Sequence, residues 1–101
     1  MSDMTVANTI LSQLGGRRFL VMTGANNLFG DDRSLTFKLP ARFAKDGISG
    51  VKVTLNRKDL YDVRYLKIAG KKVVDVATTE DLYAEDLRKD FTRKTGLETS
   101  L

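Results

Sequence analysis

Cysteine and histidine are both missing from this 101-residue sequence. Without cysteine the chain forms no disulfide bond and offers no thiolate to a metal ion, so its fold depends on packing alone. Without histidine it lacks the side chain that most often serves as a general base or binds a metal near neutral pH. These two absences argue against catalysis, and we predict a non-enzymatic protein that needs no cofactor.

Long hydrophobic runs are also missing, and proline occurs once. No stretch approaches the roughly 20 apolar residues that a helix needs to cross a bilayer. The first four residues contain neither a cationic region nor an apolar run, so we expect no signal peptide and a cytoplasmic location. Hydrophobic residues make up 42% of the chain and charged residues 30%, which is ordinary for one globular domain spanning residues 1–101.

The first third of the chain shows one helical pattern and one apolar run. Val6, Ile10 and Leu14 recur at helical spacing, which predicts a helix over 5–14 that the glycines after Leu14 terminate. Residues 19–22 are apolar on both faces, which predicts a central strand over 17–23. Residues 24–33 are rich in Gly, Asn and Asp, and we expect them to form a loop.

Alternating apolar and polar residues predict four further strands, over 34–39, 51–55, 61–65 and 72–77. If the apolar residues of the second and third of these share one face, Arg57–Asp59 forms a three-residue turn. The same register places Lys52 directly across from Arg64 on the other face. The adjacent apolar pair Tyr65 and Leu66 breaks the alternation and indicates a bulge or a strand buried on both sides.

The last third of the chain predicts a helix over about 80–94. Thr78–Asp81 supplies a capping pattern and an acidic first turn, and the final turns are basic, as the helix dipole favours. Tyr83, Leu87 and Phe91 form its apolar stripe, and Gly96 ends it. The expected fold is therefore α+β, in the order α-β-β-β-β-β-α: an antiparallel sheet of about five strands with an N-terminal and a C-terminal helix packed on it.

Positive charge is concentrated in the middle of the sequence. Residues 33–72 contain eleven Lys or Arg and three Asp, a net charge of about +8, whereas residues 1–32 sum to −1 and residues 73–101 to −3. Because this region also reads as strands and hairpin turns, many of its cations are expected on one surface. Such a surface attracts polyanions, of which nucleic acid is the most common.

The outward strand positions and the hairpin turns supply the candidate nucleic-acid-binding residues: Lys38, Lys52, Arg57, Lys58, Arg64, Lys71 and Lys72. They predict weak, salt-sensitive contacts with phosphates, without sequence preference. Tyr61 and Tyr65 are expected on the inward face, so no outward aromatic ladder is available for base stacking. The other interpretation of these cations is a solvated sheet face whose lysines protect strand edges from aggregation.

Leu28 and Phe29 are apolar residues inside the expected loop over 24–33. They predict either a partner-binding tip or a cover for the end of the core. In the first case the protein is an interaction module that inhibits or modulates a host protein or a defence complex. The loop lacks the pattern of a phosphate-binding loop, and the adjacent acids Asp31–Asp32 and Glu80–Asp81 are more typical of turns and caps than of a metal site.

Three segments together resemble a group of small proteins encoded by phages, prophages and other mobile elements. These segments are LSQLGGRRFLVMTGANN, LTFKLPARFAKDGISGVKVTLNRKDLYDV and LYAEDLRKDFTRKTGLETSL, which cover nearly the whole chain in order. The resemblance implies a bacterial cytoplasm and a dispensable accessory role. It carries over no catalytic or binding residue.

Overall fold

The computed structural model describes residues 4–40 and 44–99. The elements follow one another in this order: α1 (Thr5–Leu14), α2 (Gly16–Thr23), β1 (Asn26–Gly30), β2 (Ser34–Lys38), the 3₁₀ turn η1 (Lys45–Gly47), β3 (Gly50–Leu55), β4 (Tyr61–Ala69), β5 (Lys72–Leu82), the 3₁₀ turn η2 (Ala84–Asp86) and α3 (Leu87–Thr95). A five-stranded antiparallel sheet with helices towards both ends of the chain is an α+β fold. The fold class expected from the sequence is confirmed.

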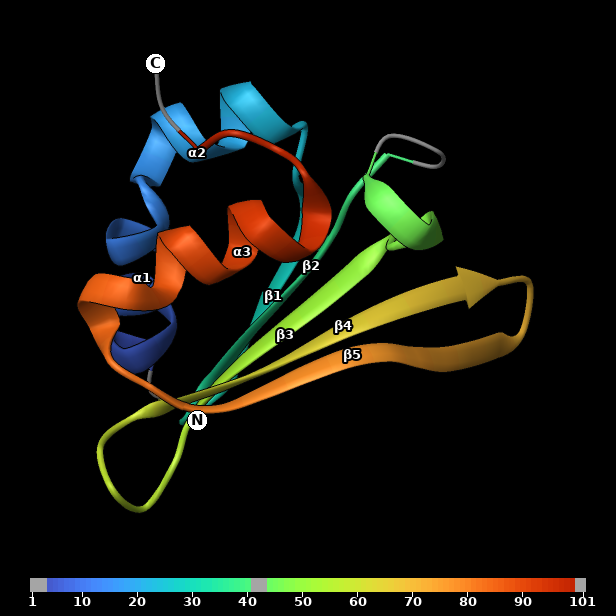
Figure 1. Cartoon of the computed structure of the whole chain (residues 1–101). Coiled ribbons are helices and arrows are strands. Elements are labelled where there is room, and N and C mark those ends of the chain that lie inside the picture. Colours follow the sequence, from blue (N-terminus) through green and yellow to red (C-terminus); the bar gives the residue numbers. More distant parts are fainter. Residues whose placement is uncertain (1–3, 41–43, 100–101) are drawn as a thin grey trace.

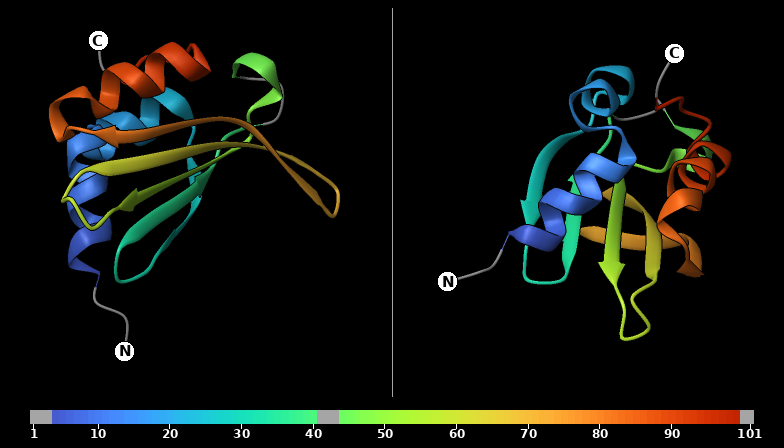
Figure 2. Two further views of the ribbon diagram at one scale, coloured as in Figure 1. Left: turned by 60° about the horizontal axis from the view of Figure 1, so that its bottom comes forward. Right: turned by 90° about the vertical axis from the view of Figure 1, so that its left-hand side faces the viewer.

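Each strand of the sheet pairs with its neighbour in the sequence, in the order β1-β2-β3-β4-β5. Figures 1 and 2 show the three α-helices on one face of this sheet. We call that face the inner face and the opposite one the outer face. The core lies between the helices and the inner face, where the ring of Phe19 in α2 meets those of Phe37 and Phe91, each with its centroid 5.3 Å away.

The register of β3 and β4 agrees with the prediction at every pair. Lys52 lies across from Arg64, and Val53 lies across from Val63 on the inner face. The backbone N–H of Asn56 donates to the carbonyl of Leu60 at 2.8 Å and closes the three-residue turn. The last turn residue, Asp59, has a φ of 60°, as is common at the end of such loops.

The irregularity predicted at Tyr65 and Leu66 is also present. Tyr65 pairs with Ala77 but Leu66 pairs with Asp75, which leaves Val76 of β5 as an extra residue. Both Tyr65 and Leu66 are buried. Because β4 pairs with β3 without interruption here, Tyr65 and Leu66 point to opposite faces, so β4 is buried on both sides at this point and the extra residue belongs to β5.

The strand expected over 17–23 is wrong, because these residues form helix α2. An apolar run by itself does not separate a buried strand from a short helix. The distinction lies in Phe19 and Thr23, which are four residues apart and both fully buried, while Val21 between them is exposed. Gly15, with a φ of 131°, separates α1 from α2, and Gly24 ends α2 in the left-handed conformation.

The loop expected over 24–33 is wrong in part, because Asn26–Gly30 forms the edge strand β1. Gly30 belongs to this strand for a steric reason. A Cβ atom there would lie 2.6 Å from the Cβ of Ala7 and 2.5 Å from the Cε of Met4 in and beside α1. The glycine that suggested a turn in the sequence is the residue that lets the strand pass this close to the helix.

The C-terminal helix begins later than predicted. Thr78–Asp81 belongs to β5, which continues to Leu82, and α3 starts at Leu87. Leu87 and Phe91 are buried as expected, but Tyr83 is 59% exposed and lies outside the stripe. Gly96 has a φ of 75°, and its N–H donates to the carbonyl of Thr92 at 2.7 Å, so the predicted helix end is correct.

Candidate nucleic-acid interface

The outer face of the sheet carries one row of side chains across all five strands. Cross-strand partners point to the same face of a sheet. The pairs Phe29↔Thr36, Thr36↔Lys52, Lys52↔Arg64 and Arg64↔Thr78 therefore place one residue of each strand in this row, with two cations side by side at its centre. Lys38, two residues from Thr36 along β2, lies on the same face.

Carboxylates balance part of the positive charge on this face. The Arg64 guanidinium donates from Nη2 and Nε to Oδ1 of Asp75 in β5, at 2.7 and 3.2 Å. Lys52 lies near Asp31, and its charge is one of the smaller influences that lower the pKa of that carboxyl. The main cause is the hydrogen bond from the backbone N–H of Arg33. Arg64 is thus neutralised more directly than Lys52.

The turn between β3 and β4 holds Arg57 and Lys58 within a polar network. Asn56 Oδ1 accepts from the backbone N–H groups of Lys58 and Leu60, at 2.8 and 3.2 Å. Lys58 Nζ lies 3.0 Å from Oδ2 of Asp81, and this hydrogen bond raises the pKa of the ammonium. Lys58 is therefore paired, whereas Arg57 is exposed at the same turn.

Lys71 and Lys72 occupy the turn between β4 and β5, at the other end of the sheet. The nine residues of β4 separate this turn from the β3–β4 turn, a span of about 26 Å at roughly 3.3 Å per residue. Figure 1 shows the two turns at opposite ends of the strands. The seven candidate residues thus occupy three places: the outer face, the β3–β4 turn and the β4–β5 turn.

Three ion pairs form within residues 4–40 and 44–99: Lys58–Asp81, Arg64–Asp75 and Arg93–Asp90. Five of the seven candidate cations take part in none of them: Lys38, Lys52, Arg57, Lys71 and Lys72. The structure therefore brings Lys52 and Arg64 together, ties Lys58 and Arg64 to carboxylates, and leaves the two lysines of the β4–β5 turn at a distance from both.

Leu28 and Phe29 lie on β1, at the opposite edge of the sheet from β5. The Phe29 side chain is 66% exposed and that of Leu28 is 39% exposed. Phe29 shares the face of Thr36, so an exposed aromatic ring stands in the same row as Lys52. The sequence does not predict this ring on the outer face, because the Gly, Asn and Asp residues around it favour a loop.

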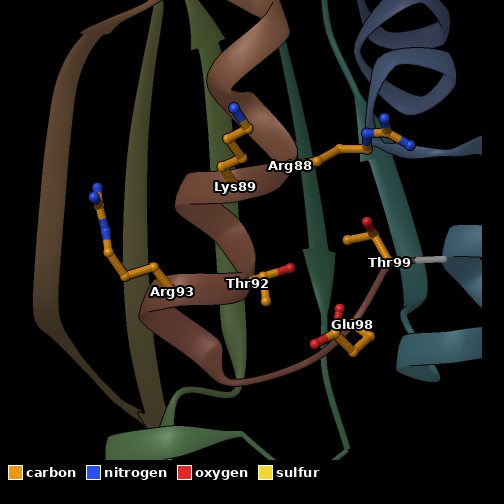
Figure 3. Close-up of a pocket in the computed structure, with 6 residues that line it drawn as sticks. All are labelled: Arg88, Lys89, Thr92, Arg93, Glu98 and Thr99. Atoms are coloured by element: carbon orange, nitrogen blue, oxygen red, sulfur yellow. The ribbon is translucent and has the colours of Figure 1, made fainter. Parts of the chain in front are cut away.

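The helical side also carries cations, several of them around a surface hollow of 410 Å³ beside α3 (Figure 3). Its lining residues are Arg88, Lys89, Thr92, Arg93, Glu98 and Thr99. In this view Arg88 and Arg93 extend to opposite sides of the helix. Arg93 donates to Oδ1 of Asp90 at 2.7 Å, and Glu98 adds a negative charge. The lining thus keeps a surplus of cations, but one of them is paired and Arg88 and Arg93 point apart.

One buried carboxylate, that of Asp90, is not among the residues predicted from the sequence. Asp90 in α3 accepts hydrogen bonds from the hydroxyls of Tyr65 and Thr79, at 2.6 and 3.1 Å, in addition to the one from Arg93. Burial, aided by this bond to Asp90, strongly raises the pKa of the Tyr65 phenol. The network fastens α3 to β4 and β5. Its signal in the sequence is an acid beside Phe91 and three residues after Leu87, on the apolar side of the helix.

The described part of the chain contains no cluster of three or more acidic side chains that would hold a metal ion. Asp31, one of the acids considered for such a site, instead accepts hydrogen bonds at Oδ1 from the N–H groups of Arg33 and Ser34, at 3.0 and 2.9 Å. Among the residues described, no helix has the length and apolar character needed to cross a membrane. Comparison with protein-family models, with curated proteins and with solved structures finds no match to this chain.

Proposed function

We propose that this protein is a non-enzymatic accessory protein of a phage or another mobile element that binds nucleic acid weakly and without sequence preference. The observation that carries the proposal is the direct opposition of Lys52 and Arg64 on the outer face. Like charges at facing positions destabilise a sheet. Asp75 already offsets the charge of Arg64, so a phosphate bound at this pair would neutralise chiefly Lys52, and the arrangement favours a polyanionic ligand.

The exposed ring of Phe29 adds a second kind of contact to the same row. It lies two strands away from Lys52, about 10 Å at the usual spacing between strands. Stacking of a base on an exposed aromatic ring is tolerant of sequence, because every base has a flat face. The row therefore combines a phosphate-binding position with a surface for a base.

Binding of a fluorescent oligonucleotide, measured by anisotropy at several salt concentrations, tests the proposal. The affinity of the wild-type protein should fall steeply between about 50 and 200 mM salt. Lys52→Gln should weaken binding and make the dependence on log salt shallower by about 0.7 to 0.9. The matched control is Lys89→Gln on α3, which removes one exposed cation from the helical side and should leave binding nearly unchanged.

A stronger variant reverses the charges at Lys52, Arg57, Lys58 and Arg64 and should abolish binding. Because Lys58 and Arg64 also form ion pairs, circular dichroism must show that this variant is folded. Micromolar binding that ignores salt, or a wild-type protein that binds no oligonucleotide at low salt, would refute the proposal.

A second candidate function is an interaction module that inhibits or modulates a host protein or a defence complex. The observation in its favour is that Leu28 and Phe29 expose apolar surface on β1, which in the described residues pairs with β2 alone. Such an edge accepts an additional strand from a partner. A pull-down from nuclease-treated bacterial lysate discriminates: recovery of one specific protein by the wild type, lost with Phe29→Ser, favours this alternative.

A further inference from the structure

The β4–β5 hairpin extends beyond the rest of the sheet. β3 pairs with β4 only as far as Gly50↔Leu66, whereas β4 and β5 continue to pair up to Ala69↔Lys72. Beyond Leu66 the side chain of Ser49 makes one more contact, as its Oγ accepts from the N–H of Ile68. We call residues 67–74 the ribbon tip. Figures 1 and 2 show it projecting away from the three α-helices.

The ribbon tip carries three lysines, Lys67, Lys71 and Lys72, and no acidic residue. All three are exposed, and none takes part in the ion pairs described above. The stem of Lys67 passes beside Gly47 in η1, which places its ammonium at the base of the tip. Three positive charges and no acid in eight residues leave the ribbon tip with unbalanced positive charge.

The flanks of the ribbon tip are apolar. Val73 is 58% exposed and Val74 is 53% exposed. Adjacent residues of a strand point to opposite faces, so each face of the ribbon presents one valine. Val73 pairs with Ile68, and Val74 pairs with Lys67. A flat acidic lipid surface would contact only one of these two faces. A ribbon that enters a groove end-first would have a groove wall beside each face.

The turn at the end of the ribbon is tight. Ala69 and Lys72 form the last pair and leave Gly70 and Lys71 as a two-residue turn. Gly70 has a φ of 62°, and Lys71 is not among the residues with positive φ, as in a type II′ turn. This glycine keeps the end of the ribbon narrow, no wider than two strands.

We propose that the ribbon tip enters the major groove of double-stranded nucleic acid. The major groove of B-form DNA is about 12 Å wide and admits a two-stranded ribbon, with phosphates on its walls and thymine methyl groups among its base edges. The lysines contact the phosphates, and the valines contact the apolar base edges. Lys38 lies two strands from Leu66 at the base of the tip, about 10 Å away, and contacts a flanking phosphate. This inference rests on the proposed nucleic-acid binding and assigns to it a ligand form and an element.

The test compares binding to a labelled DNA duplex with binding to one of its single strands. Lys67→Gln, Lys71→Gln and Lys72→Gln together form the tip variant. The control variant combines Arg17→Gln, Arg18→Gln and Lys89→Gln, which removes the same charge from exposed positions on the helices. We expect the tip variant to lose at least about tenfold in duplex affinity and about 2 to 3 in the salt slope. The control should lose less than about threefold.

Val73→Ser with Val74→Ser distinguishes groove insertion from charge attraction. It should weaken duplex binding several-fold and leave single-strand binding unchanged, because only a groove surrounds both faces of the ribbon. Equal losses on the two ligands would overturn the inference.

Two further outcomes separate failure of this inference from failure of the proposed function. If the wild type binds nucleic acid and the tip variant matches the control variant on the duplex, the inference alone is overturned. If the wild type binds neither ligand at low salt, both fall. Binding to phosphatidylserine vesicles that is lost in the tip variant, with duplex binding unchanged, would assign the tip to a lipid surface and overturn the inference.

Discussion

The two hairpin turns at the ends of β4 both carry cations and differ in what surrounds these charges. At the β3–β4 turn, Lys58 is held by Asp81, and the Asn56 amide donates to both Asp62 and Asp81, at 3.0 and 2.8 Å. At the β4–β5 turn, Lys71 and Lys72 are exposed and lie beyond the end of β3. The β3–β4 turn is therefore joined to β5 by side-chain hydrogen bonds, whereas the lysines of the β4–β5 turn are exposed to solvent.

The distribution of acids along β5 produces this difference. Asp75, Glu80 and Asp81 all lie after the first three residues of the strand, next to the part of β4 that β3 also flanks. Asp75 neutralises Arg64, and Asp81 neutralises Lys58. Lys72–Val74 contains no acid, so the ribbon tip keeps its charge. A stretch of sequence with surplus positive charge therefore identifies a binding surface only when the acidic residues of the neighbouring strand are also known.

The largest effect on this comparison is expected from Asn56→Ala. The Asn56 side chain makes four hydrogen bonds, two from backbone N–H groups and two to carboxylates. With each contributing up to about 1 kcal/mol, we expect the free energy of unfolding to fall by about 2–3 kcal/mol. Urea denaturation measures it, with Lys71→Ala at the other turn as the control. A loss below about 0.5 kcal/mol would show that the β3–β4 turn is no more constrained than the ribbon tip.

A smaller effect is expected from Gly70→Val. A Cβ atom at this position meets no other atom within 4 Å, so steric clash with the surroundings contributes nothing. The cost is that of forcing a branched residue to adopt a positive φ, about 1–2 kcal/mol. Gly70→Asn should cost less, because asparagine tolerates positive φ. Equal destabilisation by both substitutions would mean that the backbone conformation is not the cause.

The sequence predicts the local features of this fold, above all the register of β3 and β4. Strict alternation over Val51–Leu55 and from Tyr61 to Tyr65, together with the length of the turn, leaves one register that buries both apolar sets, and the structure has that register. The two adjacent apolar residues Tyr65 and Leu66 indicated that β4 is buried on both sides there, and the structure has both residues buried. These features are local, since they depend on neighbouring strands joined by a short turn.

The errors occurred where distant packing decides the conformation. In helix α2, Phe19 packs against the rings of Phe37 and Phe91, which are distant in the sequence. β5 continues through Thr78–Asp81 because β4 is long enough to pair with it, which overrides the capping pattern in those residues. Of the candidate site, the facing pair Lys52–Arg64 was predictable. The neutralisation of Lys58 by Asp81, 23 residues later, was not.

The smallest effect is expected from Lys58→Gln, compared with Lys71→Gln at the ribbon tip. The bond to Asp81 raises the pKa of Lys58 above its ordinary value of 10.5. Its stabilisation is therefore complete below pH 10.5 and is lost as the pH rises through the higher pKa of the folded state. Lys58→Gln should lower the Tm near neutral pH by less than Gly70→Val does, and the difference should shrink in 1 M salt, because both partners are exposed. Lys71→Gln should leave the Tm unchanged both at neutral pH and at high pH. Thermal unfolding at pH 7 and at a pH well above 10.5 makes the measurement, and equal effects of the two substitutions would mean that the ion pair at the β3–β4 turn contributes nothing to stability.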